Sequence, residues 1–306
     1  MHKKISFIFI IFFFFVPKFS IKNLKKNKTK QIINIAFGIS NNYAKKILVP
    51  LISILENSSN NTIYHIYILV GKDFEEKNKI KIFQLEKIYF NCFIHFKNLG
   101  KEFQGVYTSF LDISIYYRLK LPEICNNLNR IIYLDGDTII LRDLLELFSL
   151  NFEGNYIMGR LDKYPDELDR LGIYIKNNIN SGVLLMDLFN LRKYKYVDDF
   201  MNYIKEHNDE VYLHAHDQTL INYVCHDKIG ILKPVFHMWP YPNASQFLKE
   251  HRNLRIPYDP KDVEYGFKYP FIVHFPGRFK KSNSTKDTIY FKRYYEYLNI
   301  SEKMIK

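Results

Sequence analysis

Two aspartates on either side of a glycine follow a short apolar run, and their spacing suits metal binding. The run Ile131–Leu134 leads directly into Asp135, Gly136 and Asp137. Residues i and i+2 of an extended chain share one face, so both carboxylates can point at one ion. Gly136 lacks the side chain that would crowd a ligand, and paired carboxylate oxygens suit Mg²⁺ or Mn²⁺ carrying a diphosphate. The same residues could instead form an Asp-Gly turn with solvated carboxylates.

Three further segments place polar residues where strands or helices are expected to begin or end. These segments are Asn180-Ser181, Asp217-Gln218, and His274 followed by Gly277 and Lys280. Each signal is weak alone, because Asp217 could be an ordinary helix N-cap and His274 an ordinary surface histidine. Together they provide a potential metal ligand, a cation and small polar groups that could surround one ligand.

The elements that must position these residues alternate between strand and helix. Strands are predicted over Ile32–Gly38, Ile63–Val70, Tyr89–Phe96, Arg130–Leu134, Gly182–Leu188 and Phe271–Phe275. Helices are predicted over Tyr43–Glu56, Phe74–Ile88, Thr108–Cys125, Val197–His207 and Asp217–His226. Such alternation is typical of an α/β fold with a largely parallel sheet and ligands at the carboxyl ends of its strands. Residues 31–277 contain no internal repeat or low-complexity linker, which indicates one domain.

The charge of the chain is concentrated at its two ends. The 306 residues are 47% hydrophobic, enough for a sizeable core, and their net charge is +12. Residues 1–30 carry +8 and residues 278–306 carry +5, so the middle of the chain is close to neutral. A nucleic-acid-binding protein would carry its basic face on the folded domain. We therefore expect an anionic membrane surface as a partner, and no nucleic acid.

Two features bear on the cellular compartment. Cys92, Cys125 and Cys225 include no C-x-x-C pair, which excludes a disulfide framework and a thiolate zinc site and fits a reducing compartment. The apolar run Ile5–Val16 is too short to span a bilayer easily, and the dense lysines after Pro17 resist translocation. We expect a cytoplasmic, peripherally membrane-associated protein. A signal peptide, a lumenal signal-anchored form or a misassigned start codon are the alternatives.

A basic, aromatic helix is predicted over residues 287–305. Its clustered apolar residues are Ile289, Tyr290, Tyr294, Tyr297 and Leu298. Aromatic residues beside lysines suit an anionic lipid interface, and two weak membrane signals hold a protein better than one. The alternative is a capping helix that packs against the domain.

In their order and spacing, these motifs resemble glycosyltransferase family 8, the retaining enzymes that use UDP-sugars. The nearest subgroup is the bacterial lipopolysaccharide glucosyl- and galactosyltransferases. The resemblance covers about residues 32–281, and two more motifs carry it: Ala36-Phe37-Gly38-Ile39-Ser40-Asn41-Asn42-Tyr43 and Ser114-Ile115-Tyr116-Tyr117-Arg118-Leu119. It implies a single GT-A nucleotide-sugar-binding domain with a mixed, mostly parallel sheet. We expect a membrane-proximal segment at 1–30, this domain at 31–281 and the basic aromatic helix at 282–306.

The resemblance also implies roles for individual residues. The metal ligands would be Asp135, Asp137 and His274. The loop that holds the uridine would comprise Gly38, Ser40, Asn42 and Tyr43. Arg118 would reach the phosphate or sugar of the donor, and Gly277 and Lys280 would clamp the pyrophosphate. The group around the donor sugar would be Asn180, Ser181, Asp217 and Gln218.

Two departures from the family pattern affect the nucleotide. Ser40 stands where many members have Asp, which weakens the expected uracil contact. Lys281-Ser282 stands where a Pro-Trp pair often follows the clamp lysine, which weakens the expected closure over the nucleotide.

The implied reaction moves glucose or galactose from UDP-glucose or UDP-galactose to a saccharide or glycolipid acceptor, in lipopolysaccharide or cell-surface glycan synthesis. Mn²⁺ or Mg²⁺ and Lys280 would stabilise the leaving diphosphate. Gln218 would line the anomeric centre, and Asp217 would bind a sugar hydroxyl. The acceptor is expected along residues 159–179. There Asp162, Asp166 and Asp169 could bind sugar hydroxyls or lie on a solvated helix face.

Two other classes of protein compete with this interpretation. In a haloacid-dehalogenase-like phosphohydrolase, Asp135 would be the nucleophile, Asp137 the acid, and Asp198-Asp199 would complete the Mg²⁺ site. That signature requires Thr or Val two places after the second Asp, where Ile139 stands. A non-catalytic sugar-nucleotide-binding relative would be favoured by loss of a metal ligand or of Gln218, and neither is lost.

Overall fold

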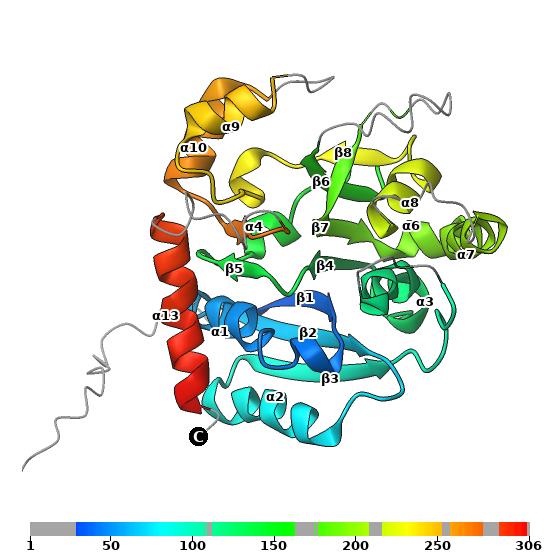
Figure 1. Ribbon diagram of the computed structural model, residues 1–306, viewed down its shortest axis with the longest axis horizontal. Coiled ribbons are helices and arrows are strands. Elements are labelled where there is room, and N and C mark those ends of the chain that lie inside the picture. Colours follow the sequence, from blue (N-terminus) through cyan, green and yellow to red (C-terminus); the bar gives the residue numbers. More distant parts are fainter. Residues whose placement is uncertain are drawn as a thin grey trace, which may run out of the picture.

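The computed structural model describes residues 29–106, 108, 112–162, 175, 177–207, 216–252, 258–277 and 288–304. Its main sheet has seven strands in the order β3-β2-β1-β4-β7-β6-β8 (Figure 1). The strands are β1 Gln31–Gly38, β2 Thr62–Val70, β3 Cys92–Asn98, β4 Arg130–Leu134, β6 Ile157–Leu161, β7 Ile179–Asp187 and β8 Ile229–Ile231. Only β7 runs antiparallel to its neighbours β4 and β6. The expected α/β fold with a mixed, mostly parallel sheet is confirmed.

A second, two-stranded sheet carries one predicted site residue. Strand β5 (Thr138–Ile140) follows the aspartate pair and runs antiparallel to β9 (Ile272–His274), with Thr138 opposite His274. Backbone hydrogen bonds therefore fix His274 beside a loop more than a hundred residues earlier in the chain.

Helices cover both faces of the main sheet because its central strands are apolar on both sides. The helices are α1 Leu48–Glu56, α2 Glu76–Ile88, α3 Leu121–Ile124, α4 Leu145–Phe148, α6 Leu188–Lys193, α7 Tyr196–His207, α8 Asp217–Val224, α9 Ala244–Glu250, α10 Pro260–Lys268 and α13 Ile289–Met304. On β1, Ile35 faces the core formed with α1 and α2, while Ala36 faces the core formed with α3, α6, α7 and α8. Such two-sided burial is typical of strands in parallel sheets.

Most predicted elements are present, and the differences follow from local chemistry. A short 3-10 turn, η1 (Asn41–Tyr43), precedes α1, so the helix predicted from Tyr43 begins at Leu48. The helix predicted over Thr108–Cys125 is instead a 3-10 helix, η2 (Ile113–Lys120), followed by α3. Pro122 lies in the first turn of α3, where its missing N–H is tolerated. Strands β6 and β8 were not predicted.

The C-terminal helix α13 packs against α1 (Figure 1). The Tyr297 hydroxyl accepts a hydrogen bond from Asn57 Nδ2 at 2.7 Å, and the Tyr290 hydroxyl donates to Phe267 O at 2.6 Å. Both tyrosines are buried. The expectation that these two side chains contact lipid is wrong, because the same apolar face is used to cover the domain.

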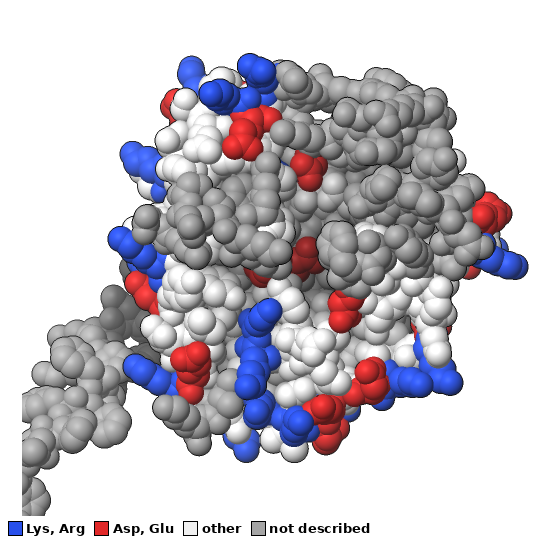
Figure 2. All heavy atoms as spheres, in the orientation of Figure 1, with Lys and Arg blue, Asp and Glu red and all other residues white. Residues whose placement is uncertain are grey.

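The segments expected at a membrane lie largely outside the described part of the chain. Residues 1–28 and 278–287 are among those that the structure does not describe. Among the described residues, no helix is both long and apolar enough to cross a bilayer. Figure 2 shows basic and acidic side chains interspersed on one face, with acidic atoms in the central recess.

Candidate active site

The loop after β4 presents two carboxylates because backbone hydrogen bonds hold it on both sides. Asp135 N donates to Gly182 O of β7 at 2.8 Å, and Thr138 Oγ1 donates to Asp135 O at 2.9 Å. Phe275 N donates to Asp137 O at 2.9 Å. The loop is thus tied to the main sheet and to the segment that follows β9.

Asp135, Asp137 and His274 form a compact group, here called the metal cluster. One ligand atom from each lies within 4.8 Å of the others. His274 Nε2 is 3.1 Å from Asp137 Oδ1 and 3.6 Å from Asp135 Oδ2. A side chain on Gly182 would overlap the His274 ring, so glycine leaves the space that this group needs. Two carboxylates and one imidazole fit a divalent ion such as Mn²⁺.

Arg118 connects the metal cluster to the next group of residues. Its Nη2 donates to Asp135 Oδ1 at 2.8 Å, and its Nε lies 3.2 Å from Asp217 Oδ2. Nη1 donates to Ser181 O at 2.5 Å, and the guanidinium lies over the Tyr133 ring. Burial lowers the pKa of Arg118, but Asp135 and Asp217 outweigh it and the pKa is raised overall. The positive charge of Arg118 therefore lies between the carboxylates of Asp135 and Asp217. The expected contact of Arg118 with the donor substrate stays a prediction.

Asp217 is the first residue of α8 and is almost fully buried. Its pKa is raised to about 6 overall, because burial and the nearby Asp135 raise the pKa more than Arg118 lowers it. The preceding residue, His216, has a φ of 48°, a backbone conformation that non-glycine residues rarely adopt. His216 thus immediately precedes the helix that carries Asp217 and Gln218.

Gln218 completes a second group with Asn180 and Asp217, here called the sugar-side cluster, and Asp162 lies beside it. Gln218 Oε1 accepts from Asn180 Nδ2 at 3.0 Å and from Ser181 N at 3.2 Å. Asp162 Oδ2 accepts from Asn180 Nδ2 at 3.0 Å and from Gln218 Nε2 at 3.4 Å. Asp162, predicted only as an acceptor contact, thus lies beside the catalytic candidates. Asp166 and Asp169 lie outside the described residues.

One buried residue that supports Gln218 was missed. Asn222 Oδ1 accepts from Ile179 N at 2.7 Å, and its Nδ2 donates to Ile179 O at 2.8 Å, which ties α8 to β7. Its position four residues after Gln218, on the same helix face, is the signal that could have identified it.

The predicted uridine loop is divided by the structure. The Tyr43 ring lies against Gly136, where a Cβ atom would come within 2.8 Å of it. A Cβ atom on Gly38 would lie 2.6 Å from Ser114 O, so both glycines permit close packing. Ser40 O accepts from Tyr43 N at 3.0 Å, and Asn42 is exposed. Neither Ser40 nor Asn42 lines the cavity described next.

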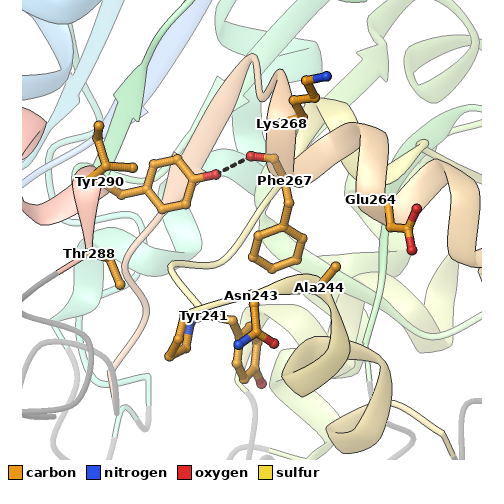
Figure 3. A pocket seen from close by; sticks show the side chains of 10 residues that line it. Tyr241, Asn243, Ala244, Glu264, Phe267, Lys268, Thr288 and Tyr290 are labelled. Atoms are coloured by element: carbon orange, nitrogen blue, oxygen red, sulfur yellow. Dashed lines mark hydrogen bonds between the residues drawn. The ribbon is translucent and has the colours of Figure 1, made fainter.

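A cavity of about 380 Å³ brings the two clusters together. The predicted residues that line it are Gly38, Tyr43, Arg118, Asp135, Gly136, Asp137, Asn180, Ser181, Asp217, Gln218, His274 and Gly277. Lys280 lies outside the described residues. A larger cavity of about 580 Å³ lies between α9, α10 and α13 and is lined by Tyr241, Phe267 and Tyr290 among others (Figure 3). It contains none of the predicted site residues.

The family model for glycosyl transferase family 8 matches residues 34–281. The chain belongs to this family. The family 8 domain thus spans both clusters and the cavity between them, and the match excludes the phosphohydrolase alternative. The chain is a glycosyltransferase with a GT-A fold.

Individual relatives agree with this assignment. General stress protein A of Bacillus subtilis is 24% identical over 285 residues, which are 89% of this chain and 95% of that protein. Lipopolysaccharide 1,2-glucosyltransferase of Escherichia coli is 26% identical over 215 residues, 65% of this chain and 61% of that protein. The solved structure of the galactosyltransferase LgtC, with donor and acceptor sugar analogs, superposes with a TM-score of 0.70. The superposition covers 88% of this chain and 96% of the LgtC chain, at 19% sequence identity. At this identity the match shows a similar fold.

Proposed function

We propose that this family 8 enzyme is a retaining hexosyltransferase that moves glucose or galactose from a UDP-sugar to a saccharide acceptor. The observation that carries the proposal is the cavity that both the metal cluster and the sugar-side cluster line, with Arg118 between them. A diphosphate and the sugar attached to it need these two environments side by side. The names of the relatives, a glucosyltransferase and a galactosyltransferase, support a hexose donor.

The chemistry of transfer requires charge at two places. Asp135, Asp137 and His274 would hold a divalent ion, which would supply positive charge against the leaving diphosphate. Gly136 and Gly182 leave the space beside these ligands, and Tyr43 offers a ring face to the base. Arg118 keeps Asp135 in place while it balances the charge of Asp217.

The sugar-side cluster acts on the other end of the donor. Gln218 Oε1 accepts hydrogen bonds from Asn180 Nδ2 and Ser181 N. A sugar that takes the place of one of these donors would have the side-chain carbonyl of Gln218 next to its anomeric carbon. The dipole of this carbonyl stabilises positive charge on that carbon. The Asp217 carboxylate, which is hydrogen-bonded to the Ser181 side chain, accepts a hydrogen bond from a sugar hydroxyl. Asp162 extends the same polar surface toward the acceptor.

Release of UDP tests this function directly. The full chain is incubated with UDP-glucose or UDP-galactose, Mn²⁺ and a panel of saccharide acceptors that can receive the hexose, and UDP is quantified, with a generic aryl phosphate as the control substrate. We expect UDP release with a hexose donor, its loss in EDTA and no hydrolysis of the aryl phosphate. Binding of UDP-sugars by thermal shift without any release would instead indicate a non-catalytic relative. A panel of donors in the same thermal-shift assay identifies the sugar.

The finer proposal on location concerns the first 30 residues. Their eight lysines and the apolar run Ile5–Val16 suit an anionic membrane surface, where each cation contributes about 1 kcal/mol. A glycolipid acceptor in the cytoplasmic leaflet would then lie within reach. Flotation with anionic liposomes at low and high salt tests this attachment. Binding that falls with salt and falls further without residues 1–30 supports it, and equal recovery of all forms in the soluble fraction contradicts it.

A further inference from the structure

A second histidine lies directly behind the metal-ligand histidine. His237 Nε2 is 3.0 Å from His274 Nδ1, on the side of the His274 ring that faces away from the carboxylates. His237 is 0% exposed, and its Nδ1 has no hydrogen-bond partner among the residues that the structure describes. Burial of a polar ring is costly without such partners. The contact with His274 Nδ1 therefore accounts for an imidazole rather than an apolar side chain at this buried position.

The backbone fixes the two rings relative to each other. His274 N donates to Met238 O at 2.8 Å, and Met238 N donates to Ile272 O at 2.9 Å. The segment after His237 thus runs beside β9 as a short parallel bridge. His237 N also donates to Pro234 O at 3.0 Å. The backbone positions of the two histidines are therefore fixed relative to each other.

The position of one hydrogen atom follows from this geometry. His274 Nε2 faces the carboxylates, so it must be unprotonated to give its lone pair to an ion. A neutral His274 then carries its hydrogen on Nδ1, and that N–H points at His237 Nε2. His237 Nε2 lies 3.0 Å from that nitrogen, so it is the atom placed to accept this hydrogen. A neutral ring with its hydrogen on Nδ1 leaves Nε2 free to accept.

We propose that His237 is a positioning residue that fixes His274 in the tautomer that binds the divalent ion. It acts by accepting the Nδ1–H of His274 through its own Nε2. Metal-ligand histidines commonly donate their second N–H to such an acceptor, and loss of the acceptor lowers metal affinity about 10- to 100-fold. The inference rests on the metal site of the proposed function.

Two variants separate the acceptor from mere filling of space. His237→Leu keeps an apolar side chain in a buried position but cannot accept a hydrogen bond. His237→Gln keeps an acceptor oxygen at a similar reach. Mn²⁺ affinity of the full chain is measured by the electron paramagnetic resonance signal of free Mn²⁺, without nucleotide. We expect affinity about 10- to 100-fold weaker for His237→Leu and within about threefold of the unaltered chain for His237→Gln.

A spectroscopic measurement tests the tautomer in the unaltered chain. Long-range ¹H–¹⁵N spectra with Mg²⁺ are expected to show the His274 proton on Nδ1, and His237→Leu should shift part of it to Nε2. Melting temperatures in EDTA establish that both variants are folded. If His237→Leu does not fold, the Mn²⁺ affinity of His237→Gln and the position of the His274 proton in the unaltered chain still test the proposal.

Three results would overturn the proposal. They are Mn²⁺ binding by folded His237→Leu equal to that of the unaltered chain, equal weakening by both variants, and a proton on His274 Nε2 with Mg²⁺ bound. These results leave the transferase proposal intact. Conversely, a chain that binds Mn²⁺ in the expected pattern but releases no UDP contradicts the transferase proposal alone.

Discussion

The metal cluster and the sugar-side cluster line one cavity, yet their polar atoms are satisfied in opposite ways. In the metal cluster, oxygens of Asp135 and Asp137 converge with the acceptor nitrogen of His274. Acceptors that face one another need a cation between them. In the sugar-side cluster, the amides of Asn180 and Gln218 already pair with neighbouring acceptors. The first cluster is therefore completed by added charge, whereas the second works by exchanging existing hydrogen bonds with a substrate.

The two clusters also differ in what holds them. The metal cluster is carried by the loop after β4 and by β9, both fixed through backbone hydrogen bonds. The sugar-side cluster depends on side-chain contacts at the start of α8 and on Asn222. Changes to the metal cluster should therefore act on ion binding alone, and changes to the sugar-side cluster on turnover.

The largest effect is expected at Arg118, because it joins the clusters. Arg118→Met leaves Asp217 buried beside Asp135 without its compensating charge. Loss of one partner of a buried pair destabilises by about 3–5 kcal/mol. Thermal unfolding in EDTA should show this loss, and Arg118→Met combined with Asp217→Asn should recover part of it. An unchanged melting temperature for the single variant would mean that the clusters are independent.

Asp137→Ala tests the metal cluster by itself. Transfer should fall by at least about 100-fold, since stabilisation of the leaving group by a metal is worth several kcal/mol. Stability in EDTA should not fall, because a carboxylate beside Asp135 is removed. Asp262→Ala, which removes a surface carboxylate near Lys233, is the matched control and should leave transfer unchanged. Full activity of the unaltered chain in EDTA would refute the three ligands.

Gln218→Ala tests the sugar-side cluster. Turnover should fall about tenfold, as expected for one lost interaction of about 1.4 kcal/mol at the reacting carbon. UDP affinity should stay the same, because Gln218 contacts Asn180 and Asp162 rather than the metal ligands. Lys280→Ala should instead weaken UDP, as loss of a charge-assisted phosphate contact does. If Gln218→Ala bound UDP more weakly than Lys280→Ala, Gln218 rather than Lys280 would be the residue that contacts the nucleotide.

The smallest effect concerns pH and Asp217. Its pKa of about 6 in the folded chain exceeds the ordinary value of 3.8, so the folded state binds more protons between these values. Its contribution to stability is fully present below pH 3.8 and is lost as the pH rises through 6. The free energy of unfolding in EDTA should fall across this window by at most about 1.4 kcal/mol per pH unit relative to Asp217→Asn. Parallel pH profiles for the two proteins would contradict the burial of this charge.

The sequence by itself could indicate what is local. The spacing of Asp135 and Asp137 and the apolar strand before them predicted a paired-carboxylate loop, because both features depend on neighbouring residues. Strands such as β1 and β2 were predicted because their apolar runs are continuous. Strand β6 was missed, since Gly159 and Arg160 interrupt its apolar pattern and its burial depends on β7. Local pattern marked His274 as a potential ligand at the end of a strand, and resemblance to the family grouped it with Asp135 and Asp137 as a metal ligand.

Only the tertiary structure decided which partners these residues have. Pairing of β5 with β9 sets His274 beside the carboxylates, and Asp162 joins Gln218 across 56 residues of chain. The apolar face of α13 would look the same for lipid or for a protein core, and contact with Asn57 of the domain settles it for Tyr297. The hydrophobic effect has no direction, so sequence gives the amount of apolar surface, while packing alone determines what it covers.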